Sequence, residues 1–137
     1  MSLLSLTLAL PAETRTEPAN ERDAAPGAAW LPVCALEDIV PNTGVCALVD
    51  GEQVAIVRVG HGQDVYAIGN FDPFSKAYVL ARGIVGDKAG VAKIASPIYK
   101  QSFDLRTGVC LDDPSVSVPV WAVRVRDGKV EVEVATQ

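Results

Sequence analysis

Four side chains in this sequence have the chemistry of zinc ligands: Cys34, Cys46, Cys110 and the lone histidine, His61. Four such ligands are the usual number for a structural zinc ion, but its cysteines commonly come in closely spaced pairs. These three cysteines lie far apart in the sequence, and His61 belongs to a stretch, residues 61–64, that is typical of an exposed turn. We therefore predict no metal site here, and we expect the cysteines to be small buried side chains.

The sequence also contains no convincing set of catalytic side chains. A Ser–His–Asp set cannot be built around a histidine that stands alone in a glycine turn, and no glycine-rich phosphate loop leads into a helix. Asp112 and Asp113 are adjacent carboxylates, but they precede Pro114 in what reads as a loop. A solvated acidic turn is expected there rather than an acid/base pair. The sequence thus predicts no catalytic residue.

Two segments combine prolines, aromatic rings and oxygen-bearing side chains in a way that the rest of the chain does not: residues 70–74 and residues 96–108. Asp72 and Ser96 could each offer an oxygen atom and Tyr99 a phenol, but Phe74 offers no ligand atom. Such a set is a poor one for any metal. We predict that these segments are loops that hold neither an iron–sulfur cluster nor a single metal ion.

The elements around these segments are predicted to be strands. From Trp30 onward, short runs of β-branched residues alternate with Gly, Pro, Asn and Asp, which is an all-β pattern. Asp-Gly pairs at residues 50–51 and 127–128 predict two tight hairpins, residues 45–59 and residues 120–134. Further strands are expected at residues 64–68 and 91–95, and a short helical turn at residues 35–39 before Pro41.

The composition defines one domain and limits its partners. At 137 residues and 49% hydrophobic content, the chain can build one core, which we place at residues 29–137, with the two loops within residues 69–108. Residues 1–28 are predicted to be a flexible extension, because residues 11–27 are charged and proline-rich. A net charge of −5 disfavours binding to nucleic acid or to a membrane surface.

The cysteine usage and the amino-terminal residues bear on the compartment. An odd number of separated cysteines suits reduced thiols in the cytoplasm. Residues 1–10 include an apolar stretch, but no Lys or Arg stands before this stretch and Pro11 ends it early, so export is not expected. No apolar run approaches the length that spans a bilayer. We expect a cytoplasmic protein.

The two loops resemble those of a Rieske domain, which carries Cys-Pro-His in its first loop and Cys-Pro-x-His in its second. In this alignment Asp72 and Phe74 occupy the first Cys and His positions, and Ser96 and Tyr99 occupy the second pair. The match runs from Trp30 to about residue 134 and includes residues 43–48, 53–56, 70–74, 95–97 and 108–110. The set is similar to the small subunits of cytoplasmic NADH-dependent nitrite reductase, a Rieske-like family whose members lack the cluster ligands.

This resemblance implies an all-β Rieske-like fold of stacked antiparallel sheets and an accessory role. It implies a large-subunit partner that carries FAD, sirohaem and a four-iron cluster and reduces nitrite to ammonium with electrons from NADH. The residues are also compatible with two other interpretations. One is a Rieske-type ferredoxin of an oxygenase system, and the other is a stand-alone β-domain that binds some other protein or ligand.

The loop residues themselves allow two interpretations. Phe74 and Tyr99 could fill the space that a cluster would occupy, stacking edge to face for about 1 kcal/mol. Alternatively, the same rings could form a docking patch for a partner together with Lys76 and Lys100. Both interpretations can hold at once.

Overall fold

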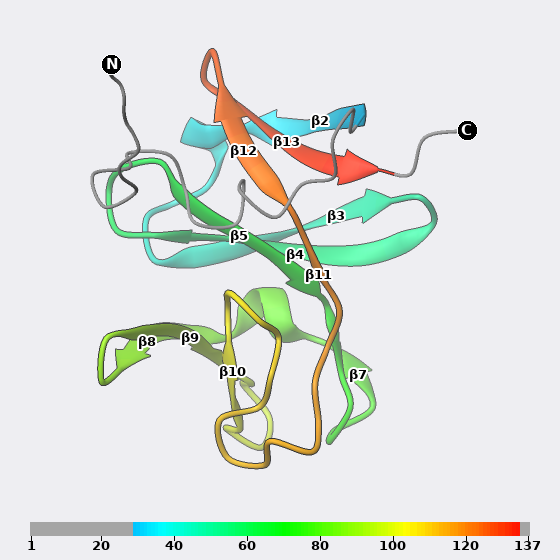
Figure 1. The fold of residues 1–137 in the computed structure, drawn as a ribbon, viewed down its shortest axis with the longest axis vertical. Helices are drawn as coiled ribbons and strands as arrows, with labels where there is room; N and C mark the ends of the chain where they lie inside the picture. Colours follow the sequence, from blue (N-terminus) through cyan, green and yellow to red (C-terminus); the bar gives the residue numbers. More distant parts are fainter. Residues whose placement is uncertain (1–28, 135–137) are drawn as a thin grey trace, which may run out of the picture.

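The computed structural model of the protein describes residues 29–134, and these residues form stacked antiparallel sheets with two short 3-10 helices (Figure 1). The all-β prediction is confirmed. The predicted extension, residues 1–28, lies outside the described residues, as do residues 135–137.

Three sheets are stacked from top to bottom in Figure 1, and a small two-stranded ribbon lies beside the lowest one. The upper sheet has the strand order β12-β13-β2, the middle sheet β11-β5-β4-β3 and the lower sheet β10-β9-β8, and the ribbon is β6-β7. In chain order the elements are β2 (Ala29–Ala35), helix η3 (Leu36–Asp38), β3 (Thr43–Val49), β4 (Glu52–Val59), β5 (Asp64–Gly69), β6 (Phe71–Asp72), β7 (Ala77–Tyr78), helix η4 (Leu80–Arg82), β8 (Ile84–Lys88), β9 (Val91–Ala95), β10 (Ser102–Asp104), β11 (Val120–Trp121), β12 (Val123–Arg126) and β13 (Lys129–Val134).

The two central strands of the middle sheet, β4 and β5, are buried on both faces, which explains their continuous apolar runs. Along β4, Val54 and Ile56 face the upper core while Ala55 and Val57 face the lower core, and all four are fully buried. Alternate residues of a strand point to opposite faces, so one strand contributes to both cores. Strand β5 behaves in the same way. A sheet covered on both faces needs apolar residues at every position rather than at every second one.

The two Asp-Gly hairpins form as predicted, and the helical turn is η3. Asp50 and Gly51 join β3 to β4 with φ angles of 50° and 83°, and Asp127 and Gly128 join β12 to β13 with φ angles of 53° and 77°. Two successive residues with positive φ define the primed turn that suits the twist of paired strands. The strands expected at residues 64–68 and 91–95 are β5 and β9.

One predicted strand, residues 120–126, is wrong as a single element. The structure divides it at Ala122 into β11, which pairs with β5 in the middle sheet, and β12, which pairs with β13 in the upper sheet. The chain passes from one layer to the next at this point (Figure 1). Ala122 is buried, and its carbonyl accepts the backbone N–H of Glu133, which holds the crossing in place.

Candidate functional site

The segments singled out from the sequence, residues 70–74 and 96–108, each contribute to one connecting loop, and the two loops have the same backbone construction. The first, residues 72–76, joins β6 to β7, and the second, residues 96–101, joins β9 to β10. In each loop the first residue is followed by proline, and its carbonyl accepts the backbone N–H of the lysine four positions on. These distances are 2.8 Å for Lys76 to Asp72 and 3.1 Å for Lys100 to Ser96. Both lysines have a positive φ, 61° and 70°.

The first side chain of each loop also caps its own turn. Asp72 Oδ1 accepts the backbone N–H of Phe74 at 2.9 Å, and Ser96 Oγ accepts that of Ile98 at 3.2 Å. Such contacts from residue i to residue i+2 are characteristic of Asp and Ser in turns. The loops therefore need no bound group to explain their backbone shape, because their own side chains satisfy the turn amides.

A buried hydrogen bond joins the two loops directly. Ser96 Oγ donates to Asp72 Oδ2 at 2.6 Å, and both residues are fully buried. Ser75 Oγ donates to the same carboxylate oxygen at 2.8 Å. A carboxylate can accept several hydrogen bonds, and hydrogen bonds to an ionised group are shorter and stronger than neutral ones. Asp72 and Ser96, the two positions aligned with cluster-binding cysteines, thus form the link between the loops.

The pKa of the Asp72 carboxyl lies below its ordinary value. Burial alone raises this pKa, because it penalises the charged form. Hydrogen bonds from the Ser96 and Ser75 hydroxyls and from the backbone N–H groups of Phe74 and Ser75 outweigh burial and lower the pKa. Asp72 is therefore an ionised acceptor at neutral pH, with its oxygens committed to groups of the two loops.

The aromatic residues of the loops separate instead of meeting. Phe74 is half-buried and packs against Phe103 of β10, with ring centroids 6.2 Å apart. Tyr99 is 60% exposed. The predicted stacking of Phe74 on Tyr99 is wrong, and Tyr99 does not fill space between the loops. Its position explains the difference, because it lies between Ile98 and Lys100 at the tip of the second loop, where all three residues are exposed.

Sequence reasoning missed Ser75 and the structural role of Asn70. Asn70 is 3% exposed, and its side chain joins three elements. Nδ2 donates to Gln53 Oε1 of β4 at 3.1 Å, and Oδ1 accepts the backbone N–H of Ala81 in η4 at 2.7 Å. A weaker contact of 3.6 Å runs from Nδ2 to Cys46 Sγ of β3. These partners are distant in sequence, whereas Ser75 follows Asp72 at a spacing that could have indicated a turn.

The cysteines and the histidine lie apart. Cys110 is fully buried in the lower core, Cys34 is half-buried, and Cys46 is exposed, so the expectation that all three are buried is wrong for Cys46. Cys46 lies on β3, whose outer edge has no strand partner in the described sheets. His61 is exposed in the predicted turn between β4 and β5. Residues 29–134 contain no group of three His, Cys, Asp or Glu side chains placed to hold a metal.

The adjacent carboxylates, Asp112 and Asp113, are exposed, as predicted for an acidic turn. Each also accepts a hydrogen bond. Asp112 Oδ2 accepts the backbone N–H of Ser102 at 2.7 Å, and Asp113 Oδ1 accepts the Ser115 hydroxyl at 2.6 Å. These two carboxylates therefore fasten the loop 111–119 to β10 and to itself.

The donor set of the two loops does not fit a Rieske cluster. That cluster is held by two thiolates on one iron and two imidazoles on the other. The four aligned positions here offer a carboxylate, a phenyl ring, a hydroxyl and a phenol: Asp72, Phe74, Ser96 and Tyr99. In addition, Asp72 and Ser96 already bond to each other.

Comparison with known proteins agrees with this fold. Residues 29–133 match the model of the Rieske-like [2Fe-2S] domain. The chain therefore belongs to the family of Rieske-like domains.

Two relatives show which kind of Rieske-like protein this chain is similar to. The NADH nitrite reductase small subunit of Salmonella typhimurium is 48% identical over 103 residues, which cover 75% of this chain and 95% of that protein. The solution structure of the nitrite reductase [NAD(P)H] small subunit from Erwinia carotovora superposes with a TM-score of 0.68 at 45% identity, covering 79% of this chain and 83% of that one. The chain therefore belongs to the family of NADH nitrite reductase small subunits.

A third relative has a different organisation. The nitrite reductase [NAD(P)H] large subunit of Klebsiella oxytoca is 39% identical over 114 residues, which cover 83% of this chain but only 12% of that protein. A segment similar to this chain is thus part of a much longer polypeptide there. Within residues 29–134 of the present chain, no helix is long and apolar enough to cross a membrane.

Proposed function

We propose that this chain acts in nitrite reduction as a docking subunit without an iron–sulfur cluster of its own. The observation that carries the proposal is the 2.6 Å hydrogen bond between Ser96 and Asp72, at the two positions aligned with cluster thiolates. It joins the loops from within, so no cluster is needed to hold them together. A chain without a redox centre contributes to electron transfer only by contact with the protein that carries the electrons.

That partner is the large subunit of the reductase. The family resemblance implies that it carries FAD, sirohaem and a four-iron cluster, and that it reduces nitrite to ammonium with electrons from NADH in the cytoplasm. The Klebsiella oxytoca relative supports the partnership, because a segment similar to this chain is covalently part of a large subunit there. In the present protein, a noncovalent interface would replace that covalent link.

The loop tips supply a surface suited to docking. Lys76, Tyr99 and Lys100 are exposed, and Phe74 lies half-buried between the first loop and β10. The carboxylate of the first loop, Asp72, is buried and does not reach this surface. The tips are therefore basic and aromatic in a chain whose net charge is −5. Such a patch fits an acidic and partly apolar surface of the large subunit.

Iron analysis tests the first part of the proposal. The chain is purified from iron-replete cells, and bound iron, sulfide and visible absorption are measured. We expect no stoichiometric iron and no absorption band of a cluster. One [2Fe-2S] cluster per chain would overturn the proposal and favour a Rieske-type ferredoxin.

Reconstitution tests the partnership. NADH-dependent nitrite reduction by the purified large subunit is measured with and without this chain, and complex formation is followed by size-exclusion chromatography. We expect a stable complex and higher activity in the presence of the chain. Absence of any association would reject the docking role and leave a stand-alone β-domain.

Charge reversal tests the loop tips. The double variant Lys76→Glu/Lys100→Glu should bind the large subunit at least ~10-fold more weakly, with the largest difference at low ionic strength. Lys88→Glu/Lys129→Glu is a matched control, because both lysines are exposed and lie outside the two loops. Equal affinities of the two double variants would show that the tips are not the docking surface.

A further inference from the structure

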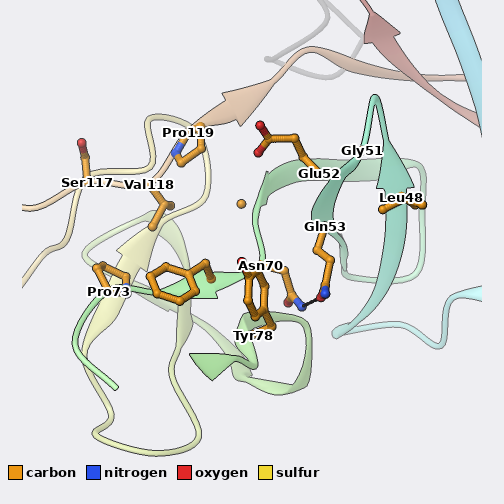
Figure 2. A pocket seen from close by; sticks show the side chains of 12 residues that line it. Leu48, Gly51, Glu52, Gln53, Asn70, Pro73, Tyr78, Ser117, Val118 and Pro119 are labelled. Atoms are coloured by element: carbon orange, nitrogen blue, oxygen red, sulfur yellow. Dashed lines mark hydrogen bonds between the residues drawn. The ribbon is translucent and has the colours of Figure 1, made fainter. Parts of the chain in front are cut away.

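A groove of about 530 Å³ lies beside the first loop, between the middle sheet and the β6–β7 ribbon (Figure 2). One wall contains Phe71, Pro73 and Tyr78, and the opposite wall contains Leu48 at the end of β3. The remaining rim includes Val118 and Pro119 from the segment before β11. Its volume lies in the range typical of specific binding sites.

The aromatic wall of the groove, Phe71 and Tyr78, is exposed although its two rings pack against each other. Phe71 and Tyr78 are cross-strand partners in the ribbon, and their ring centroids are 5.0 Å apart at an interplanar angle of 59°. Yet 38% of Phe71 and 58% of Tyr78 remain accessible, and Leu48 across the groove is 69% exposed. Large exposed apolar side chains that gather in one hollow mark an interaction site more strongly than scattered ones do.

The floor of the groove is fixed by Asn70. Its side chain bonds to Gln53, which lines the groove, and to the backbone of Ala81 beneath it, as the dashed line in Figure 2 shows for Gln53. The backbone N–H of Asn70 also donates to the Gln53 carbonyl at 3.0 Å. These hydrogen bonds hold Asn70, the residue between β5 and β6, and so fix the position at which the ribbon begins. The two rings of the ribbon are therefore positioned without a bound partner. A preformed groove loses little conformational entropy on binding.

We propose that this groove receives a segment of the large subunit, one that carries an apolar side chain and a neighbouring Lys or Arg. The proposal rests on the docking role above and adds a second contact surface to the loop tips. Pro73 belongs to both the groove and the first loop, so the two surfaces are continuous. The apolar side chain would lie between Leu48 and the rings of Phe71 and Tyr78.

The charge of the groove specifies the basic residue. Glu52 is the one charged side chain among the lining residues, and it is exposed at the rim. Asp50 lies in the exposed turn just before it, and no lining residue is a cation, so a negative group of a partner would meet only negative charge there. The groove thus selects a positive segment, whereas the loop tips select a negative one. Two patches of opposite sign fix the orientation of a docked partner as well as its position.

Substitutions in the groove test this inference by affinity. Tyr78→Ser and Leu48→Ser should each weaken binding to the purified large subunit by at least ~10-fold, as expected for residues at the centre of an interface. Val40→Ser and Ile84→Ser are matched controls, because these side chains are 65% and 61% exposed and lie outside the groove. Thermal unfolding of each variant verifies that the fold is retained.

The outcomes separate this inference from the docking role itself. Groove variants that bind as tightly as the controls, while the loop-tip variant binds weakly, would overturn the groove and leave the docking role intact. A parent chain that does not bind the large subunit would overturn both. Glu52→Lys should also weaken binding, and unchanged or tighter binding of this variant would reject the basic segment.

A photo-crosslinker placed at residue 78 of the assembled complex identifies the occupant. We expect the crosslink to map to one segment of the large subunit with a Lys or Arg close to the crosslinked position. A crosslink to a second copy of this chain would overturn the proposal in favour of self-association through the groove.

Discussion

The carboxylate of Asp72 is fully buried, and removing the hydroxyl of its partner Ser96 should lower the stability of the fold. Ser96→Ala leaves a buried charge with one hydrogen bond fewer, so we expect a loss of about 1.5–3 kcal/mol in the free energy of unfolding, measured by urea denaturation. Ser115→Ala is a matched control. Its hydroxyl also donates to an aspartate at 2.6 Å, but the pair is exposed, and the loss should stay within about 0.5 kcal/mol. Equal losses would mean that burial does not strengthen the Ser96 contact.

The lowered pKa of Asp72 gives a pH dependence with a defined sign. The folded-state pKa lies below the unfolded value of about 3.9, so the folded state gains stability from the ionised form. This contribution is complete above the unfolded pKa and is lost as the pH falls through the folded pKa. Asp72→Asn removes it. The stability difference between parent and variant should therefore shrink in thermal unfolding between about pH 5 and pH 2. A difference that stays constant over this range would contradict the assignment.

Gly108 fixes the turn that follows β10. Its φ is 81°, and a Cβ at this position would collide with the Val118 carbonyl oxygen. Gly108→Ala combines backbone strain with overpacking, so we expect it to lower the free energy of unfolding by at least about 2 kcal/mol in urea. Gly62→Ala serves as the control, since no atom lies within 4 Å of its added Cβ. If both variants unfold at the same urea concentration, the close approach of Gly108 to Val118 is not a constraint.

Some turns and strand ends could be predicted from neighbouring residues in the sequence, and others could not. The turns at Asp50 and Asp127 were predictable because Asp-Gly favours positive φ at both positions. The turn between β8 and β9 has the same geometry, with φ of 53° at Ala89 and 86° at Gly90, but alanine rarely adopts this conformation and gave no signal. The break at Ala122 was also hidden, because an alternating valine pattern indicates a strand without indicating its sheet.

The candidate site likewise has features that the local sequence predicts and features that depend on tertiary packing. The positions of Asp72 and Ser96 could be aligned with cluster ligands, but their mutual hydrogen bond joins residues 24 apart and depends on how β6 and β9 are brought together. The exposure of Tyr99 depends likewise on the direction in which the second loop leaves the lower sheet. Local patterns therefore located the loops, while tertiary packing decided which of their side chains are inside.

The middle sheet couples the upper and lower cores, so the two cores should unfold together. Ile56 lies in the upper core and Ile68 in the lower core, and both are fully buried. Ile56→Val and Ile68→Val remove the same methylene group and should each cost about 1 kcal/mol. Since β4 and β5 belong to both cores, either variant should lower the stability of both by the same amount.

Amide hydrogen exchange measures this coupling at reporters in each core. Val130 and Val132 report on the upper sheet, and Ile94 and Phe103 report on the lower one; all four residues are fully buried. Under conditions where exchange follows global opening, Ile68→Val should accelerate exchange at Val130 as much as at Ile94. Acceleration confined to Ile94 and Phe103 would mean that the lower sheet opens by itself. In that case the loops could change shape while the upper sheets stay folded, and a docked large subunit would then have to order the loops as well as contact them.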